Sequence, residues 1–289
     1  MSKPPHSIDR ERVRHISAFA DGDASGGNPA GVYVSANMPD EAHMRELAAE
    51  LGYSETAFVV PQGESFRVRY FSPESEVPFC GHATIALGAV LAAKHGVGVF
   101  DLQLNDATIS VEAFEEDGSQ VIALQSPATH SAPAATELLD EALALFSLST
   151  DDLDPRFVPA RAHGGADHLL LILNTRDAVA AMGYSLDAGR DFMNRHGLVT
   201  VLIGFAESDR LFHTRNAFAS GGVLEDPATG AATAALAGYL RDIDWPHDGD
   251  VSIVQGEDMG QRSLLRAQFS NDPGSSIRVS GRARTMRVA

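Results

Sequence analysis

The chain has 289 residues, 44% of them hydrophobic and 21% charged, which is typical of a globular protein able to bury one large core or two medium ones. We favour two domains at this length. A formal net charge of −17 and a pI near 4.9 argue against nucleic acid or an anionic membrane as a partner, because both would be repelled. The single cysteine excludes an internal disulfide. No apolar run approaches the ~20 residues that a membrane-spanning helix needs, and residues 1–12 do not resemble a signal peptide. We therefore expect a soluble, cytoplasmic protein without a membrane segment.

Apolar alternation and turn residues predict strands, and an apolar period near 3.6 residues predicts helices. The first half is predicted to contain strands at 13–20 and 31–34 with a turn at 26–29 between them, a helix at 41–51, strands at 56–60 and 66–71, an apolar helix at 81–95, and strands at 99–104, 108–113 and 121–124. The second half is predicted to contain helices at 136–145, 175–182, 186–196 and 230–240, an exposed acidic loop at 151–155, an extended segment at 212–216, and strands at 168–173, 199–205, 251–254, 264–269 and 277–279. The small, polar, proline-bearing stretch 126–133 is interpreted as the crossing between domains. The predicted domains are 13–127 and 128–276, with the segment 277–289 returning to the first.

The two apolar helices and the residues before them form an internal repeat. Aligned without a gap, residues 76–91 and 225–240 share a Glu-x-Pro-x-x-Gly motif and further positions in the helix; the matched pairs are Glu76/Glu225, Pro78/Pro227, Gly81/Gly230, Ala83/Ala232, Thr84/Thr233, Ala86/Ala235, Leu87/Leu236 and Leu91/Leu240. Alanine-rich helices match by chance easily, but alanine bias does not explain the motif that precedes them. The repeat therefore indicates a duplicated fold with two buried central helices.

The start of each repeated helix is a candidate ligand site. A helix N-terminus offers N–H groups without intrahelical acceptors and a partial positive charge, which suit a carboxylate. Gly81 and Gly230 would let a ligand approach the backbone, or they could simply permit close packing. The residues alone do not decide between these two readings.

Several motifs together resemble the PhzF-like family of phenazine-biosynthesis isomerases. They occur in the order and spacing typical of that family and cover nearly the whole chain: 27–31, 54–58, 69–73, 76–84, 225–230, 255–260 and 279–281. The resemblance implies an α+β, diaminopimelate-epimerase-like fold, with two pseudo-symmetric domains that are each a curled β-sheet around a central helix. It also implies a ligand cleft between the domains.

The resemblance implies roles for individual residues as well. The glutamate of the Ser-Glu-Thr motif is the general base and acid in the family, and here it is Glu55, while His82 and Asp226 are implied to shuttle or donate protons and to orient the substrate. The substrate-binding residues implied are Gly81, His82, Gly230, Ala231, Asn28 and Cys80. The expected partner is a small carboxylate-bearing metabolite, without a cofactor, and a homodimer is the assembly to test.

Each of these residues also has a plainer interpretation. Glu55 could begin a strand at a solvated edge, Asp226 could cap a helix, and His82 could be an ordinary polar residue of a first helical turn. Related epimerases use two thiols, but the counterpart of Cys80 in the second half is not a cysteine, so Cys80 is expected to pack or to line the substrate. No histidine spacing suggests a metal cluster, and we expect no metal site.

The chain departs from the phenazine enzyme in two places. That enzyme has proline after Gly-His and serine after the second glycine, where this chain has Ala83 and Ala231. The lost hydroxyl counts against dihydro-hydroxyanthranilate as the substrate but leaves the proton-transfer residues in place. Two hypotheses remain: an isomerase that moves a proton through Glu55, and a non-catalytic module that binds a metabolite or a protein in the same cleft.

Overall fold

The computed structural model describes residues 10–22 and 26–287, so most of the polar N-terminal segment and the last two residues lie outside the described part. The chain divides into two compact units. Unit 1 takes its described residues from 1–24, 28–124 and 280–289, and unit 2 from 25–27 and 125–279. None of the helices in the described residues is long and apolar enough to cross a membrane.

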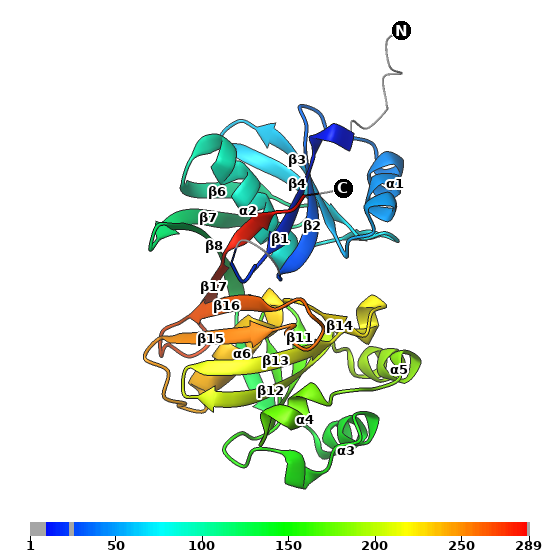
Figure 1. Cartoon of the computed structure of the whole chain (residues 1–289), viewed down its shortest axis with the longest axis vertical. Coiled ribbons are helices and arrows are strands. Elements are labelled where there is room, and N and C mark those ends of the chain that lie inside the picture. Colours follow the sequence, from blue (N-terminus) through cyan, green and yellow to red (C-terminus); the bar gives the residue numbers. More distant parts are fainter. Residues whose placement is uncertain (1–9, 23–25, 288–289) are drawn as a thin grey trace. The chain divides into compact units, whose positions relative to one another are not determined.

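Unit 1 consists mainly of strands wrapped around one helix (Figure 1). After a 3₁₀ turn at Arg10–Arg12 its elements are β1 (Val13–Ala18), β2 (Asn28–Val34), α1 (Glu41–Leu51), β3 (Thr56–Gln62), β4 (Ser65–Phe71), β5 (Glu76–Val77), α2 (Gly81–His95), β6 (Gly98–Gln103), β7 (Thr108–Glu116), β8 (Ser119–Ala128) and β18 (Ala283–Thr285). Strand β8 ends in unit 2, and β18 pairs with β1 in unit 1.

Unit 2 has the same kind of architecture with more helices on its outside. Its elements are β9 (His130–Pro133), α3 (Thr136–Leu145), a 3₁₀ turn (Thr150–Asp152), β10 (Ala160–His163), β11 (Asp167–Leu173), α4 (Arg176–Ala180), α5 (Leu186–His196), β12 (Thr200–Ser208), β13 (Leu211–Ala217), a 3₁₀ turn (Ala219–Gly221), β14 (Glu225–Asp226), α6 (Gly230–Asp242), β15 (Asp250–Gln255), β16 (Ser263–Gln268) and β17 (Ser276–Gly281). Strand β17 begins in unit 2 and ends in unit 1.

The strand pairings of the two units follow one scheme. In unit 1, β1–β2 is antiparallel, β2–β3 parallel, β3–β4 and β4–β5 antiparallel, β4–β6 parallel and β6–β7 antiparallel. In unit 2 the pairs β10–β11, β11–β12, β12–β13, β13–β14, β13–β15 and β15–β16 repeat these directions in the same order. A shared topology of this length supports the duplication inferred from the sequence. A twofold axis between the halves stays a prediction.

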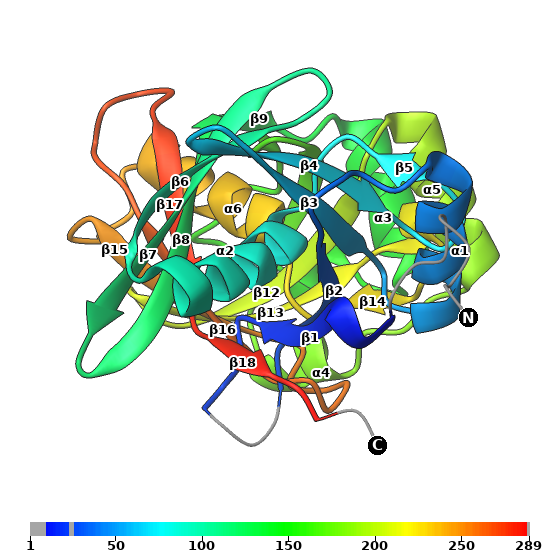
Figure 2. The ribbon, with the colours of Figure 1, turned by 90° about the horizontal axis from the view of Figure 1, so that it is seen from above.

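Each unit buries the helix that the repeat singled out, as predicted. Helix α2 lies against β1, β2, β3, β6, β7 and β18, and nearly all of its first eight residues are buried (Figure 2). Helix α6 is buried from Ala232 to Arg241 and contacts β9, β10, β11 and β16. Small residues allow this close fit: a Cβ on Gly88 of α2 would come within 2.6 Å of Ile122 Cγ2.

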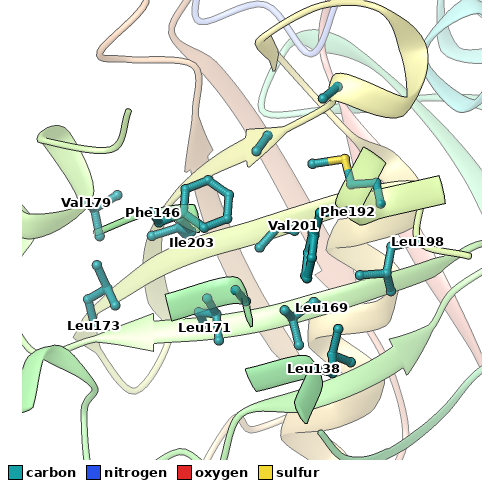
Figure 3. Packing of buried hydrophobic residues seen from close by; sticks show 14 residues of the cluster. Leu138, Phe146, Leu169, Leu171, Leu173, Val179, Phe192, Leu198, Val201 and Ile203 are labelled. Carbon is teal, nitrogen blue, oxygen red and sulfur yellow. The ribbon is translucent and has the colours of Figure 1, made fainter. Parts of the chain in front are cut away.

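Outer helices complete each core. In unit 1, Met44, Leu47 and Ala48 of α1 are buried with Phe58 and Phe71 of β3 and β4, on the helix face that the sequence pattern predicts. In unit 2, side chains from α3, α4 and α5 pack against β11 and β12 (Figure 3); the labelled members are Leu138, Phe146, Leu169, Leu171, Leu173, Val179, Phe192, Leu198, Val201 and Ile203. The unit 1 core thus buries Phe58 of β3, the strand that begins directly after Glu55.

Some sequence expectations need correction. The first strand ends at Ala18 rather than Ala20, because Phe19 has a positive φ of 58° that an extended strand cannot hold. The expected helix at 175–182 is one short turn, Arg176–Ala180. The stretch 126–133, in which no strand was expected, includes the end of β8 and all of β9. The exposed acidic loop at 151–155 begins as a 3₁₀ turn, and its Asp154 is buried in an ion pair with Arg156.

Candidate functional site

The carboxylate of Glu55 is positioned by the turn between α1 and β3. Helix α1 ends at Gly52, whose left-handed conformation reverses the chain, and Glu55 directly precedes β3. The Glu55 carbonyl accepts a hydrogen bond from the Gly31 N–H at 3.4 Å. A Cβ on Gly31 would meet Thr56 Oγ1 at 2.9 Å, so this glycine lets β2 lie close to the start of β3.

Cys80 and His82 come from the start of α2. Cys80 occupies the N-cap position and His82 lies in the first turn. The Thr84 hydroxyl donates to the Cys80 carbonyl at 2.7 Å, and it lies 2.7 Å from the Tyr70 hydroxyl. Burial raises the pKa of Tyr70, so the Tyr70 hydroxyl stays neutral and can take part in this buried chain. These bonds tie the start of α2 to β4.

The side chains of Glu55, Cys80 and His82 converge. His82 Nε2 lies 3.4 Å from Glu55 Oε2 and 3.2 Å from Ser54 Oγ. Cys80 Sγ lies 3.5 Å from Glu55 Oε2 and 3.4 Å from His82 Nδ1. The His82 and Glu55 side chains are 7% and 14% exposed, so the cluster is shielded yet reachable from solvent. Glu55 directly precedes a strand, but its side chain is less exposed than at a solvated edge, and His82 is a buried polar residue of the first turn of α2.

This arrangement is chemically suited to proton transfer. A carboxylate, an imidazole and a thiol within hydrogen-bonding reach can pass a proton among themselves. Ser54 provides a hydroxyl that can orient the imidazole of His82. The three ligand-type atoms of Glu55, Cys80 and His82 all lie within 4.8 Å of one another, so they could also hold a metal ion.

The glutamate of each repeated motif forms an ion pair with an arginine of the neighbouring strand. Arg69 Nε donates to Glu76 Oε1 at 2.7 Å in unit 1, and Arg215 Nη2 donates to Glu225 Oε2 at 2.6 Å in unit 2. The hydrogen bonds from Arg69 lower the pKa of Glu76. The Glu-x-Pro-x-x-Gly motif therefore fixes the approach to each central helix.

The site residues expected in the second half also lie around a helix start. Asp226 is buried in β14, and its carboxylate accepts a hydrogen bond from Thr229 Oγ1 at 2.5 Å. Gln255 is fully buried; its amide donates to the Asp226 carbonyl at 2.7 Å and accepts from the Thr229 N–H at 3.1 Å. The N-cap of α6 is Thr229, so Asp226 does not occupy the capping position.

The side chains at the N-cap positions do not cap either helix. Neither Cys80 nor Thr229 makes a side-chain capping hydrogen bond. A Cβ on Gly81 would find only Leu124 Cδ2, at 4.0 Å, so close packing does not explain this glycine. Gly230 and Ala231 begin α6, and Asn28 is buried at the start of β2.

The sequence does not predict the roles of three residues near the site. Ser54 contacts His82, Gln255 supports Asp226, and Arg215 forms the ion pair with Glu225. Arg69 precedes Glu76 by seven residues, but Arg215 precedes Glu225 by ten, so a gapless alignment misses the match. An alignment that allowed a gap before the motif would have found it.

A separate hollow in unit 2 lies away from these residues. It has a volume of about 420 Å³ and is lined by residues that include Arg241, Trp245 and Phe269. Arg241 is near the C-terminal end of α6, whereas Gly230 begins it, and a helix of 13 residues is about 20 Å long. The hollow therefore does not belong to the helix starts.

Comparison with known proteins places these features in one family. Residues 16–289 match the model of the family described as phenazine biosynthesis-like protein. The chain is 30% identical to the uncharacterized isomerase YddE of Escherichia coli O157:H7, over 95% of this chain and 96% of the relative. It is also 30% identical to the trans-2,3-dihydro-3-hydroxyanthranilate isomerase of Pseudomonas fluorescens, over 92% of this chain and 94% of the relative. The crystal structure of a PhzF-family phenazine biosynthesis protein from Bacillus anthracis superposes with a TM-score of 0.82 at 20% identity, covering 95% of this chain and 96% of that one.

Proposed function

Because the chain belongs to the phenazine biosynthesis-like protein family, whose named relatives are isomerases, we propose that it is a cofactor-independent isomerase that shifts a proton on a small, carboxylate-bearing metabolite. Glu55 is the general base and acid of this proposal. The observation that carries it is the convergence of Glu55, Cys80 and His82 at the start of α2.

The proposed reaction is one proton abstraction and one proton return. The Glu55 carboxylate takes a proton from a substrate carbon, and the electron pair left behind moves into the conjugated system of the substrate. Glu55 then returns the proton to a different carbon, so the enzyme and the substrate composition are unchanged at the end. His82, 3.4 Å from the carboxylate, is placed to hold or exchange that proton.

The negative charge that develops on the substrate needs stabilisation. The uncapped first turn of α2 supplies N–H groups and a positive dipole end beside Glu55, which we propose hold a substrate carboxylate. The open space at Gly81 supports this role. Asp226, Gly230 and Ala231 are proposed to take part from unit 2, and the cleft between domains stays a prediction.

The substrate is proposed only as a class. The Pseudomonas fluorescens relative is named for trans-2,3-dihydro-3-hydroxyanthranilate, so that compound is the first to assay, although the hydroxyl missing at Ala231 counts against it. Ala231 removes the hydroxyl expected at the second helix start, which favours a substrate that needs one hydrogen-bond donor fewer.

Solvent exchange tests the proposal directly. The EDTA-treated protein is incubated with candidate carboxylates in heavy water, and deuterium at carbon is measured by mass spectrometry. With a substrate in hand, Glu55→Gln keeps the shape of the side chain but cannot accept a proton, so turnover should fall by ~100-fold or more while ligand binding persists. The matched control is Glu46→Gln on the exposed face of α1, which should keep parental turnover.

Two outcomes would count against the proposal. Parental turnover in Glu55→Gln would move the role of base to His82 or Asp226. Tight binding of a carboxylate with no exchange in the parental protein would favour the rival hypothesis, a non-catalytic metabolite-binding module.

A further inference from the structure

We propose that Glu55, Cys80 and His82 form a Zn²⁺ site at the start of α2, with one open coordination position. A thiolate sulfur, an imidazole nitrogen and a carboxylate oxygen are the protein ligands that zinc takes, and three of them leave room for a water. These are the residues whose ligand atoms gather within 4.8 Å of one another.

The three separations suit one zinc ion once the His82 ring turns. Cys80 Sγ lies nearer to His82 Nδ1, at 3.4 Å, than to Nε2, at 3.9 Å, so the ring must rotate for the Nε2 lone pair to point at the ion. The Glu55 Oε2–His82 Nε2, Glu55 Oε2–Cys80 Sγ and Cys80 Sγ–His82 Nε2 separations are 3.4, 3.5 and 3.9 Å. A point equidistant from three atoms at these separations lies about 2.1 Å from each, and zinc bonds are about 2.0–2.3 Å long. A displacement out of the plane lengthens all three bonds, and a slight shift towards the Glu55–His82 edge keeps the bonds to oxygen and nitrogen shorter than the bond to sulfur. The fourth, tetrahedral direction is left for water.

The charges also balance. Zinc binds the thiolate, so Cys80 gives up its thiol proton to solvent when the Zn–S bond forms, and His82 must present the Nε2 lone pair. The ion's two positive charges are then matched by the Cys80 thiolate and the Glu55 carboxylate. The side chains of Glu55 and His82 are only 14% and 7% exposed, so this neutralisation occurs with little solvent screening.

The donor set determines which ions bind. Sulfur and nitrogen favour Zn²⁺ and Co²⁺ over Mg²⁺ and Ca²⁺, which prefer oxygen alone. Bound zinc would occupy the Glu55 carboxylate and the His82 imidazole together. If the proposed isomerase function holds, on which this consequence rests, zinc is a reversible inhibitor.

The single cysteine of the chain makes a direct test possible. The full-length protein, treated with EDTA and reductant, is titrated with Co²⁺ alone. We expect one equivalent to give a sulfur-to-cobalt charge-transfer band in the near ultraviolet, together with the visible bands of a tetrahedral ion, and Zn²⁺ to abolish both. Because no other thiol exists in the chain, the charge-transfer band reports Cys80.

Variants separate this site from adventitious binding. Cys80→Ser should lose the charge-transfer band, and His82→Gln should bind Zn²⁺ at least about 10-fold more weakly in competition with a chromophoric chelator. His163→Gln is the matched control, because His163 stacks on His130 and contacts Asp167, which makes it part of an alternative donor group in unit 2. The His163→Gln variant should bind Zn²⁺ with the parental affinity. Circular dichroism checks that each variant is folded.

The proposal is overturned if saturating Co²⁺ gives no charge-transfer band in the parental protein. It is also overturned if folded His82→Gln keeps parental zinc affinity, or if His163→Gln alone weakens binding. Neither measurement uses turnover. A failed zinc site thus leaves the deuterium-exchange test of the isomerase intact, and a failed isomerase leaves the metal titration intact.

Discussion

The buried histidine of unit 2 should make the stability of that unit depend on pH. His168 is fully buried in β11, where burial lowers its pKa from 6.5 to about 3. The Thr200 hydroxyl donates to Asn216 Oδ1 at 3.1 Å, so it must accept from His168 Nδ1 at 2.8 Å, which leaves the lone pair on Nε2. That nitrogen has no hydrogen-bond partner among the described residues. A proton added there would be buried without an acceptor.

The size of the effect follows from the two pKa values. Below pH 6.5 the unfolded chain binds a proton at this histidine, whereas the folded unit stays neutral until about pH 3. The unfolded state therefore gains about 1.4 kcal/mol for each pH unit below 6.5. Between pH 7.5 and pH 5 the free energy of unfolding should fall by about 2 kcal/mol through His168 alone. His168→Gln cannot be protonated, so this part of the slope should vanish.

Urea unfolding followed by tryptophan fluorescence measures this difference. The single tryptophan, Trp245, is buried in the same unit as His168 and reports on its unfolding. Val201→Ala is the control, because it weakens the same core without removing a titrating group, and its curve should run parallel to the parental one. If the parental and His168→Gln curves also run parallel from pH 7.5 to pH 5, the reasoning about the buried neutral imidazole is refuted.

Two further predictions concern the frame of α2. Gly81→Ala should leave thermal stability unchanged or slightly higher, because its Cβ would find open space, but it should weaken carboxylate binding at least several-fold in calorimetry. For Gly88→Ala, the free energy of unfolding in urea should instead fall by about 1–3 kcal/mol, because its Cβ would press on Ile122. Equal stability of these two variants would contradict the packing described for the helix. Glu76→Gln breaks the ion pair with Arg69 and should cost about 1–2 kcal/mol at neutral pH. Because Arg69 lowers the pKa of Glu76, this contribution is present above the ordinary carboxyl pKa of 4.5 and is lost as pH falls through the lowered value, so the parent and the variant should converge in acid.

The sequence predicts the helices well because their signals are local. Helix α1 runs from 41 to 51 as expected, since Asp40 caps its start, its apolar residues recur at helical spacing, and Gly52 ends it. Helix α2 likewise matches 81–95. Short polar strands are different. Strands β9 and β10 pair with each other across some 30 residues of chain, and nothing within 130–133 or 160–163 marks them as extended.

The candidate site could be predicted only as a set of residues. The motifs named Glu55 and His82, but Glu55 and Cys80 are 25 positions apart, and only the folded chain brings their side chains to 3.5 Å. The sequence therefore does not predict the contact of Cys80 Sγ with the Glu55 carboxylate, and the histidine spacing does not indicate the group of metal-ligand atoms that these residues form. Side-chain convergence depends on the register of β3 against β2 and on the close approach at Gly31, which periodicity does not reveal.

The repeated pairing scheme has a consequence for how this scaffold can diversify. The strand registers can be followed from the matched glutamates Glu76 and Glu225. In this alignment Thr200 corresponds to Glu55, Thr229 to Cys80 and Ala231 to His82. These three positions therefore carry a carboxylate, a thiol and an imidazole in unit 1 but two hydroxyls and a methyl group in unit 2. Thr200 is fixed by its buried hydrogen bonds with His168 and Asn216. Under the proposed function, the Ala231 side chain is the position at which substrate preference could be altered while Glu55, Cys80 and His82 keep their side chains.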